Sequence, residues 1–221
     1  MSTVTVAGLI DKAKIILQDT TDPGIRWPDE ELLGWLNDSY REIILARPDA
    51  NTLSADYTCV AGTRQKLNSG AFAEALRLID VVRNTSGRAI RQLDRSILDD
   101  QRRDWHAETG SDTIEHFMFD PRLPREFLVY PPATTSAELE VVYSSVPASH
   151  SDQTGVIKLP DSYANAMLDY TLYRAYSKDA EYAANAQRAI SHYQAMQSAI
   201  GMKSASDIAA NPIDVGDKTI R

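Results

Sequence analysis

The apolar positions near both ends of the chain recur three and four residues apart, which is the spacing of an amphipathic helix. Four helices are predicted, over about residues 6–18, 28–46, 160–176 and 179–200. Pro28 suits the first turn of the second helix, and Pro48 ends that helix because it disfavours helical geometry at the residue before it. Gly201 fits the C-terminal cap of the fourth helix.

Between these helices, from residue 51 to about residue 146, the pattern changes to alternating apolar and polar residues, which is typical of strands. The predicted elements are a hairpin over residues 52–68 that turns at Ala61-Gly62-Thr63, strands over 75–84, 87–94 and 137–147, a short helix over 95–105, and a second hairpin over 115–132 around Pro121 and Pro124. Strands average roughly 5–6 residues, so this segment indicates a β-rich module of about six strands.

The first two helices cannot bury their apolar stripes alone, so we expect them to pack against the last two. The predicted fold class is α+β: a four-helix bundle built from both chain ends, with an inserted β-rich module and an extended C-terminal arm. The expected bounds are residues 1–50 and 157–201 for the two halves of the bundle, 51–156 for the module and 202–221 for the arm.

Composition and charge narrow the possible functions. The single cysteine, Cys59, excludes an internal disulfide and fits a reducing compartment, or a particle assembled in one. No apolar run approaches the ~20 residues of a membrane span, and the N-terminus lacks the features of a signal peptide. The net charge of -8 comes from 23 basic and 31 acidic residues, and no segment is a basic nucleic-acid domain of the usual kind.

The cations of the β-rich module are almost all arginine. Ten of the eleven in residues 51–156 are Arg, and only Lys66 is Lys. Arginine is enriched in protein–protein interfaces and holds carboxylates or phosphates with two parallel hydrogen bonds. Codon bias in a GC-rich genome would give the same composition, so both explanations stay open. The candidate interface arginines are Arg77, Arg83, Arg88, Arg91, Arg95, Arg102 and Arg103.

The sequence contains no common catalytic motif: no P-loop, Rossmann fingerprint, H-E-x-x-H or G-x-S-x-G. The nearest approach to a catalytic site is "DDQRRDWH", in which Asp104 and His106 would be the acid–base pair of a small hydrolase. We favour a solvated helix end with Arg–Asp pairs that Trp105 anchors, because no nucleophile, metal set or oxyanion element accompanies the pair. We therefore expect no enzymatic activity, no cofactor and no metal.

The third predicted helix carries Tyr163, Tyr170 and Tyr173 along one face. Such spacing suits base stacking, but core packing is favoured because this helix lacks a basic face. Its apolar residues nevertheless cover more than one side. A helix of this kind is either central in a bundle or packed against a neighbouring subunit, and the second option makes these tyrosines candidate interface residues.

Several blocks of sequence carry a resemblance to a known family. They are "RWPDEELLGWLNDSYREIILARPDANT", "LIDVVRN", "GRAIRQLDRSILDDQRRDWH", "FDPRLPREFLVYPP" and "DSYANAMLDYTLYRAYSKDAEYAANAQRAISHYQAM". Over about Ile10 to Gly201 the chain resembles the bacteriophage head-to-tail adaptor (connector) proteins, which are similar to tail tubular protein A. The most specific blocks are W-P-D-E-E-L-L-x-W-L-N and the one that starts at YANAMLDY.

This resemblance implies a virion structural protein at the head–tail junction, assembled in the host cytoplasm. Such adaptors form a twelve-subunit ring below the portal, extend the DNA channel and present a docking surface to the tail or nozzle. The implied partners are the portal protein, a tail or nozzle protein and other copies of the chain, with genomic DNA passing through without sequence-specific binding and no membrane involved. A stopper or terminator of the tail is the alternative within the same particle.

The last segment, residues 202–221, is polar and without a clear period, so we expect an extended arm. Our hypothesis is that this arm embraces the portal or a neighbouring adaptor, since a segment that orders on binding can cover a wide surface. Its candidate contact residues are Met202, Ile208, Ile213, Val215, Ile220 and Arg221.

Overall fold

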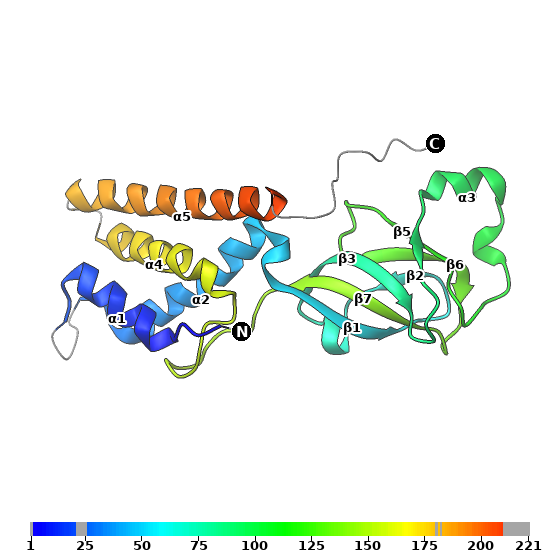
Figure 1. Cartoon of the computed structure of the whole chain (residues 1–221), viewed down its shortest axis with the longest axis horizontal. Coiled ribbons are helices and arrows are strands. Elements are labelled where there is room, and N and C mark those ends of the chain that lie inside the picture. The colour runs from blue at the N-terminus through cyan, green and yellow to red at the C-terminus, as the bar shows by residue number, and fades with distance from the viewer. Residues whose placement is uncertain (1, 21–25, 180, 182, 210–221) are drawn as a thin grey trace. The chain divides into compact units, whose positions relative to one another are not determined.

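The computed structural model describes residues 2–20, 26–179, 181 and 183–209. Over these residues the fold is α+β, with five α-helices and two β-sheets (Figure 1). The chain forms two compact units: a helical unit of Met1–Arg47 with Pro147–Arg221, and a β unit of Pro48–Val146. Residues 147–156, which the sequence pattern assigns to the β-rich module, belong to the helical unit.

The helical unit brings together helices from the two ends of the chain. It contains α1 (Val6–Leu17), α2 (Asp29–Ala46), the 3₁₀ turn η4 (Asp161–Tyr163), α4 (Ala164–Lys178) and α5 (Ala183–Ala209). In Figure 1, α4 lies between α5 and the pair of α1 and α2, and it contacts all three helices. The apolar residues on more than one side of α4 are therefore covered by helices of the same chain.

Local signals explain where these helices begin. Thr5 caps α1, because its hydroxyl accepts a hydrogen bond from the N–H of Gly8 at 3.1 Å. Pro28 precedes α2, whose first turn holds three acidic residues at the positive end of the helix dipole. The sequence predicted the start of α2 at Pro28, and both helices lie within two residues of their predicted bounds.

The fourth predicted helix ends in a different place. α5 continues past Gly201 to Ala209, so the expected cap at Gly201 and the expected extended arm over residues 202–209 are wrong. Gly201 lacks the positive φ of a left-handed cap. Glycine inside a helix costs about 1 kcal/mol relative to alanine, which the rest of a long helix can absorb. Residues 210–221 lie outside the described part of the chain.

The β unit consists of two sheets and short helices. The strands are β1 (Thr52–Thr58), β2 (Gly62–Lys66), β3 (Ala75–Asn84), β4 (Arg91–Gln92), β5 (His116–Phe119), β6 (Glu126–Ala133) and β7 (Glu138–Ser145). One sheet has the order β1-β7-β3, the other β2-β6-β5-β4, and only β4 and β5 pair in parallel. The short helices are η1 (Pro48–Asn51), η2 (Gly70–Phe72), α3 (Arg95–Gln101) and η3 (Trp105–Ala107).

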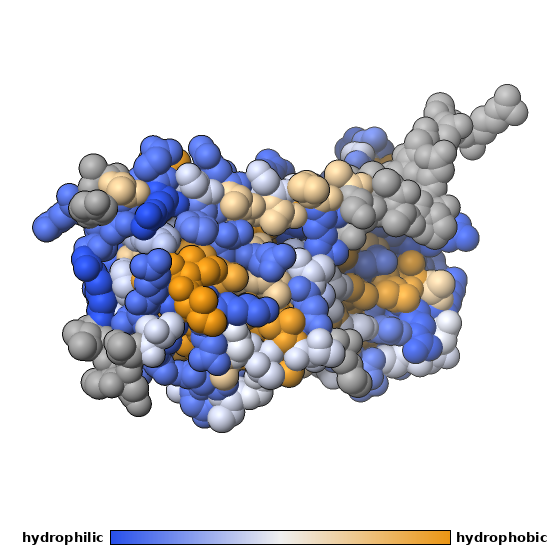
Figure 2. Space-filling model, turned by 60° about the vertical axis from the view of Figure 1, so that its left-hand side comes forward, coloured by the Kyte–Doolittle hydropathy of each residue, from blue (hydrophilic) through white to orange (hydrophobic). Residues whose placement is uncertain are grey.

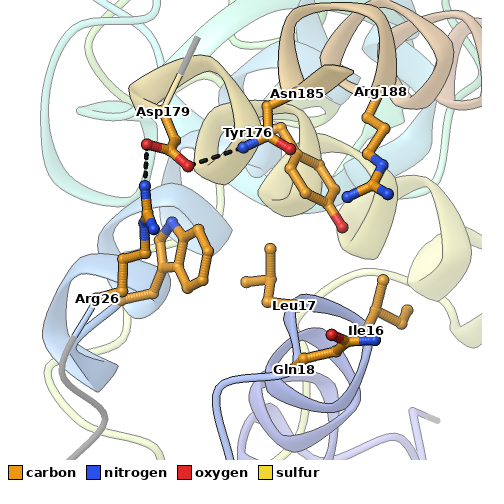
Figure 3. A pocket seen from close by; sticks show the side chains of 9 residues that line it. Ile16, Leu17, Gln18, Arg26, Tyr176, Asp179, Asn185 and Arg188 are labelled. Atoms are coloured by element: carbon orange, nitrogen blue, oxygen red, sulfur yellow. Dashed lines mark hydrogen bonds and ion pairs between the residues drawn. The ribbon is translucent and has the colours of Figure 1, made fainter. Parts of the chain in front are cut away.

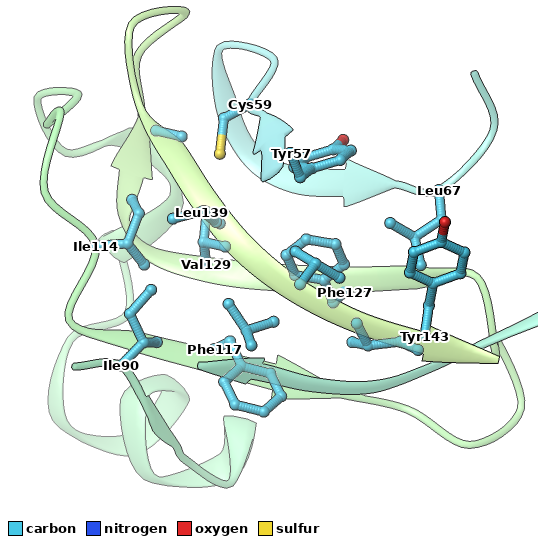
Figure 4. Packing of buried hydrophobic residues seen from close by; sticks show 14 of the residues in the cluster. Tyr57, Cys59, Leu67, Ile90, Ile114, Phe117, Phe127, Val129, Leu139 and Tyr143 are labelled. Carbon is cyan, nitrogen blue, oxygen red and sulfur yellow. The ribbon is translucent and has the colours of Figure 1, made fainter. Parts of the chain in front are cut away.

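Apolar side chains of both sheets form the core of the β unit. Figure 4 shows Phe117, Phe127 and Val129 of one sheet beside Leu139 and Tyr143 of the other. All five are buried, as the alternation of the sequence predicts for the inner faces of two packed sheets.

The predicted hairpin over residues 52–68 does not form, because β1 pairs with β7 whereas β2 pairs with β6. The buried side chain of Gln65 holds the connection instead. Its Oε1 accepts the N–H of Val60 at 2.8 Å, and its Nε2 donates to the carbonyls of Val60 at 2.8 Å and Gly62 at 3.0 Å. Gly62 has φ +108°, which other residues rarely adopt, so the chain turns from one sheet into the other here.

The other strand predictions fare better. The second predicted hairpin is confirmed as the antiparallel pair β5 and β6, joined through Pro121 and Pro124. β3 and β7 also lie where the pattern places them. The strand predicted over residues 87–94 shrinks to the two residues of β4, because the preceding Ile90 is buried and donates its N–H to the carbonyl of Val82 at 3.1 Å instead.

Candidate interaction surfaces

The segment that most resembles a catalytic site is a packed helix end. Trp105 is fully buried, and its Nε1–H donates to Asp99 at 3.0 Å. This bond, together with Arg95, lowers the pKa of the Asp99 carboxyl. Nδ1 of His106 lies 2.8 Å from the hydroxyl of Thr63. Across the described residues no hydrogen bond joins Asp104 to His106, so the geometry favours the anchoring role of Trp105 over an acid–base pair.

Other chemistry is equally sparse. Within the described ranges, no group of three or more His, Cys, Asp or Glu side chains is arranged to hold a metal ion. Burial raises the pKa of the Cys59 thiol to about 12, so this cysteine stays protonated and unreactive at neutral pH. None of the helices in the described part is long and apolar enough to cross a membrane.

All seven candidate arginines are exposed in the β unit. Five of them contact a partner within that unit: Arg77 the ring of Phe119, Arg83 Glu140, Arg88 Glu115, Arg95 Asp99, and Arg102 Glu108. Arg91 and Arg103 have no ion pair among the described residues. These two are the candidates whose charge is most available to another molecule.

The candidate tyrosines of η4 and α4 pack mainly inside the helical unit. Tyr163 is 2% exposed and Tyr170 is 7% exposed, so little of either ring is left for a partner. Tyr173 is half-buried and lies against Tyr170 and Tyr193, with ring centroids 5.8 and 5.0 Å apart. Of the three candidates, only Tyr173 reaches the surface appreciably.

The candidates at the C-terminal end are only partly described. Met202 is 73% exposed on α5, and the backbone of Ile208 belongs to the same helix. Ile213, Val215, Ile220 and Arg221 lie outside the described residues.

Three exposed apolar residues on β3, Leu76, Ile79 and Val82, form a row that the candidate interface residues did not include. β3 and β7 slip in register at three places, and Leu76, Ile79 and Val82 are left without a pairing partner on β7. All three are bulge residues, and they are 43%, 42% and 38% exposed. In "ALRLIDVVRN" the buried positions recur at every third residue (Ala75, Leu78, Val81 and Asn84) and not at every second, which leaves the apolar row exposed. A regular strand alternates with a period of two, so the sequence alone does not reveal this row.

Hydrophobic side chains reach the surface in the helical unit as well, including Ile15 and Leu45. Figure 2 shows hydrophobic patches on one face of the molecule, set within a mostly hydrophilic surface. Patches of this kind are typical of proteins that bind other proteins.

The helical unit also holds a pocket of about 570 Å³, shown in Figure 3. Asp179 accepts hydrogen bonds there from Arg26 and, at 2.7 Å, from Asn185. The guanidinium of Arg188 lies 5.6 Å from the centre of the Tyr176 ring. The hydrogen bonds of Asp179 are made to other residues that line the pocket. These bonds link neighbouring segments of the helical unit, and the geometry favours a structural role over a catalytic one.

Comparison with known families decides between these interpretations. The family model described as SU10 adaptor protein matches residues 4–216, which is nearly the whole chain. The chain belongs to the SU10 adaptor protein family. The resemblance to phage head-to-tail adaptors that the sequence blocks carry is thereby confirmed. A search of curated proteins finds no match.

An SU10 adaptor is a structural component of the virion, and its role is to interact with other phage head and tail proteins. This argues against the hydrolase interpretation of Asp104 and His106.

Proposed function

We propose that this SU10 adaptor forms a ring of twelve subunits at the head–tail junction, where it joins the portal to the tail or nozzle and extends the DNA channel. The observation that carries the proposal is the family match over residues 4–216. A ring of identical subunits requires a head-to-tail contact that closes on itself. Each subunit must therefore offer two different surfaces to its neighbours, besides those for the portal and the tail.

Several exposed side chains suit these contacts. The apolar row of Leu76, Ile79 and Val82 on β3 provides aliphatic area, and Arg91 and Arg103 provide charge without a partner among the described residues. A buried apolar centre with polar contacts around it is the usual anatomy of an interface. The net charge of -8 suits a channel wall that lets DNA pass without gripping it.

The helical unit supplies the rigid part of the subunit. We propose that α1, α2, α4 and α5 form a four-helix bundle, which the contacts of α4 with the other three support. Helix α2 buries Leu32, Leu36, Tyr40 and Ile43 in this unit. Its role is then to hold the subunit's shape during assembly and not to carry a reaction.

The mass of the particle tests the proposal. Size exclusion with light scattering is applied to the chain alone and after mixing it with the purified portal ring of the same phage. We expect about twelve copies of the chain to bind each portal ring. A chain that does not bind the portal would contradict the proposal and favour a stopper or terminator.

A matched pair of variants locates the contact. Ile79→Asp puts a charge into the exposed row of β3 and is expected to reduce the number of copies that join the portal. Ser86→Asp adds the same charge in an exposed turn of the β unit and is expected to change nothing. Equal assembly by both variants would remove β3 from the interface.

A further inference from the structure

The two sheets of the β unit have four edge strands, and three of them are protected against pairing with another chain. β3 has its three bulges, and the N–H of Leu78 already donates to the carbonyl of Pro124 at 2.7 Å. β2 is irregular between Gly62 and Arg64, and β4 has only two residues. Bulges and short strands are common ways of blocking an edge.

β1 lacks every one of these protections. Its seven residues, Thr52–Thr58, pair with β7 in an unbroken register (Figure 1). The strand contains no proline, no lysine and no bulge. β1 is therefore the one regular edge among the described strands, and an edge of this kind is a template for a strand from another molecule.

The register identifies the backbone groups on this open edge. The N–H of Cys59 donates to the carbonyl of Ala137 at 2.9 Å, which continues the β1–β7 ladder by one residue. Hydrogen-bonded pairs alternate along an antiparallel ladder, so Leu53, Ala55 and Tyr57 bond to β7. The N–H and C=O groups of Ser54 and Asp56 then point away from β7. Within the described part of the chain these backbone groups have no partner.

We propose that the open edge of β1 binds residues 210–221 of a second copy of this chain as an added strand. This inference rests on the proposed ring, in which every subunit offers its edge to a neighbour and the contact repeats. Twelve extended residues span up to ~40 Å, which is longer than the seven-residue edge of β1. Residues 210–221 follow directly after α5. The strand that one copy adds to β1 of its neighbour would therefore be attached to a long helix at its N-terminal end.

The side chains of the segment match the edge. Ile213 and Val215 flank Asp214, so an extended chain places both aliphatic side chains on one face. That face would cover Leu53, which is exposed at the end of β1 although it faces the core side of the sheet.

One charged pair suits the same pairing. Asp56 of β1 is exposed and has no ion pair among the described residues. The donor segment has no net charge, since Asp214 and Asp217 offset Lys218 and Arg221, but an extended chain places Lys218 on the face opposite Ile213 and Val215, which is the face of Asp56. An opposite charge across neighbouring strands contributes roughly 0.2–1 kcal/mol, so a contact between Lys218 and Asp56 would help to set the register of the added strand.

A proline substitution tests the edge directly. Ser54→Pro removes one N–H from the open edge but leaves the ladder between β1 and β7 intact, which is where edge strands tolerate proline. Ser54→Ala is the matched control, because it removes the hydroxyl that donates to Glu140 at 3.2 Å and keeps the N–H. Each full-length chain is titrated into a fluorescein-labelled peptide of residues 210–221, and binding is followed by anisotropy.

We expect the parent chain and Ser54→Ala to bind the peptide alike, and Ser54→Pro to bind about tenfold more weakly. Equal binding by Ser54→Pro, or no binding by the parent, would overturn the proposal. The peptide assay requires no portal, so a negative result would not contradict the adaptor proposal. Likewise, a failure of ring assembly on the portal would not affect the interpretation of the peptide assay.

Hydrogen exchange on the parent chain keeps the test independent of the variants' folding. Excess peptide is expected to slow exchange at the amides of Ser54 and Asp56 and to leave those of Leu53 and Ala55 unchanged, since these are already bonded. In the chain without peptide, the protection of Ser54 and Asp56 is expected to rise with protein concentration. Protection that is independent of concentration would mean that a chain covers its own edge, which would refute the second copy.

Discussion

Replacing Gln65 with leucine tests why β1 and β2 enter different sheets. The Gln65 side chain is fully buried, and its amide makes three hydrogen bonds of 2.8–3.0 Å to the backbone of Val60 and Gly62. The hydroxyl of Tyr57 donates a longer bond to it at 3.4 Å. Leucine has a similar volume and keeps the packing, but it leaves those backbone groups without a partner.

The expected loss follows from these bonds. A net hydrogen bond contributes about 0.5–1.5 kcal/mol, and a buried group left unpaired costs about 1–3 kcal/mol. Part of the cost is recovered, because Val60 lies in an exposed turn where water can reach its backbone. We therefore expect Gln65→Leu to lower the free energy of unfolding of the β unit by about 2–4 kcal/mol.

Pulse-labelling hydrogen exchange in increasing urea measures this loss, because peptides from residues 48–146 report the β unit separately from the helical unit. Gln92→Leu is the control: it makes the same chemical change on an exposed side chain of β4 and is expected to stay within about 0.5 kcal/mol of the parent. If Gln65→Leu also stays within that range, the buried amide does not hold the crossover and our explanation of the sheet change is wrong.

Three further predictions concern other parts of the chain. Trp105→Ala is expected to destabilise the β unit by about 3–5 kcal/mol in the same exchange experiment, because the ring is fully buried; a loss below 1 kcal/mol would contradict the anchoring role. Asp161 accepts hydrogen bonds from residues 2–4, which hold the pKa of its carboxyl well below the usual range. Its stabilising effect is thus present above about pH 4 and is lost as the pH falls toward the lower folded value, so thermal melts of the parent should drop more steeply between about pH 5 and pH 3 than those of Asp161→Asn. Cys59 is expected to resist Ellman's reagent at pH 8 in the native chain and to react at once in urea, and rapid native reaction would show that the β unit opens there.

The sequence by itself determined the elements whose pattern is local. Residues near one another in the chain define the apolar stripes of α1 and α2, the hairpin of β5 and β6 with Pro121 and Pro124 in its turn, and the alternation of β7. The family followed from the same blocks of sequence. The anchoring role of Trp105 was also favoured in advance, since nothing else in "DDQRRDWH" completes a catalytic site.

Only the tertiary structure decided which strands pair and which apolar side chains remain exposed. β1 and β2 look like a hairpin in sequence, but each finds its partner some 60–90 residues away, and the buried amide of Gln65 is recognisable only once both sheets are assembled. Tyr170 and Tyr176 of α4 become core residues because α1, α2 and α5 all cover that helix, whereas Tyr173 stays half-buried. A periodic pattern reveals that a side chain needs burial, whereas the neighbour that buries it comes from a distant part of the chain, and for that reason the open edge of β1 had no signature in the sequence.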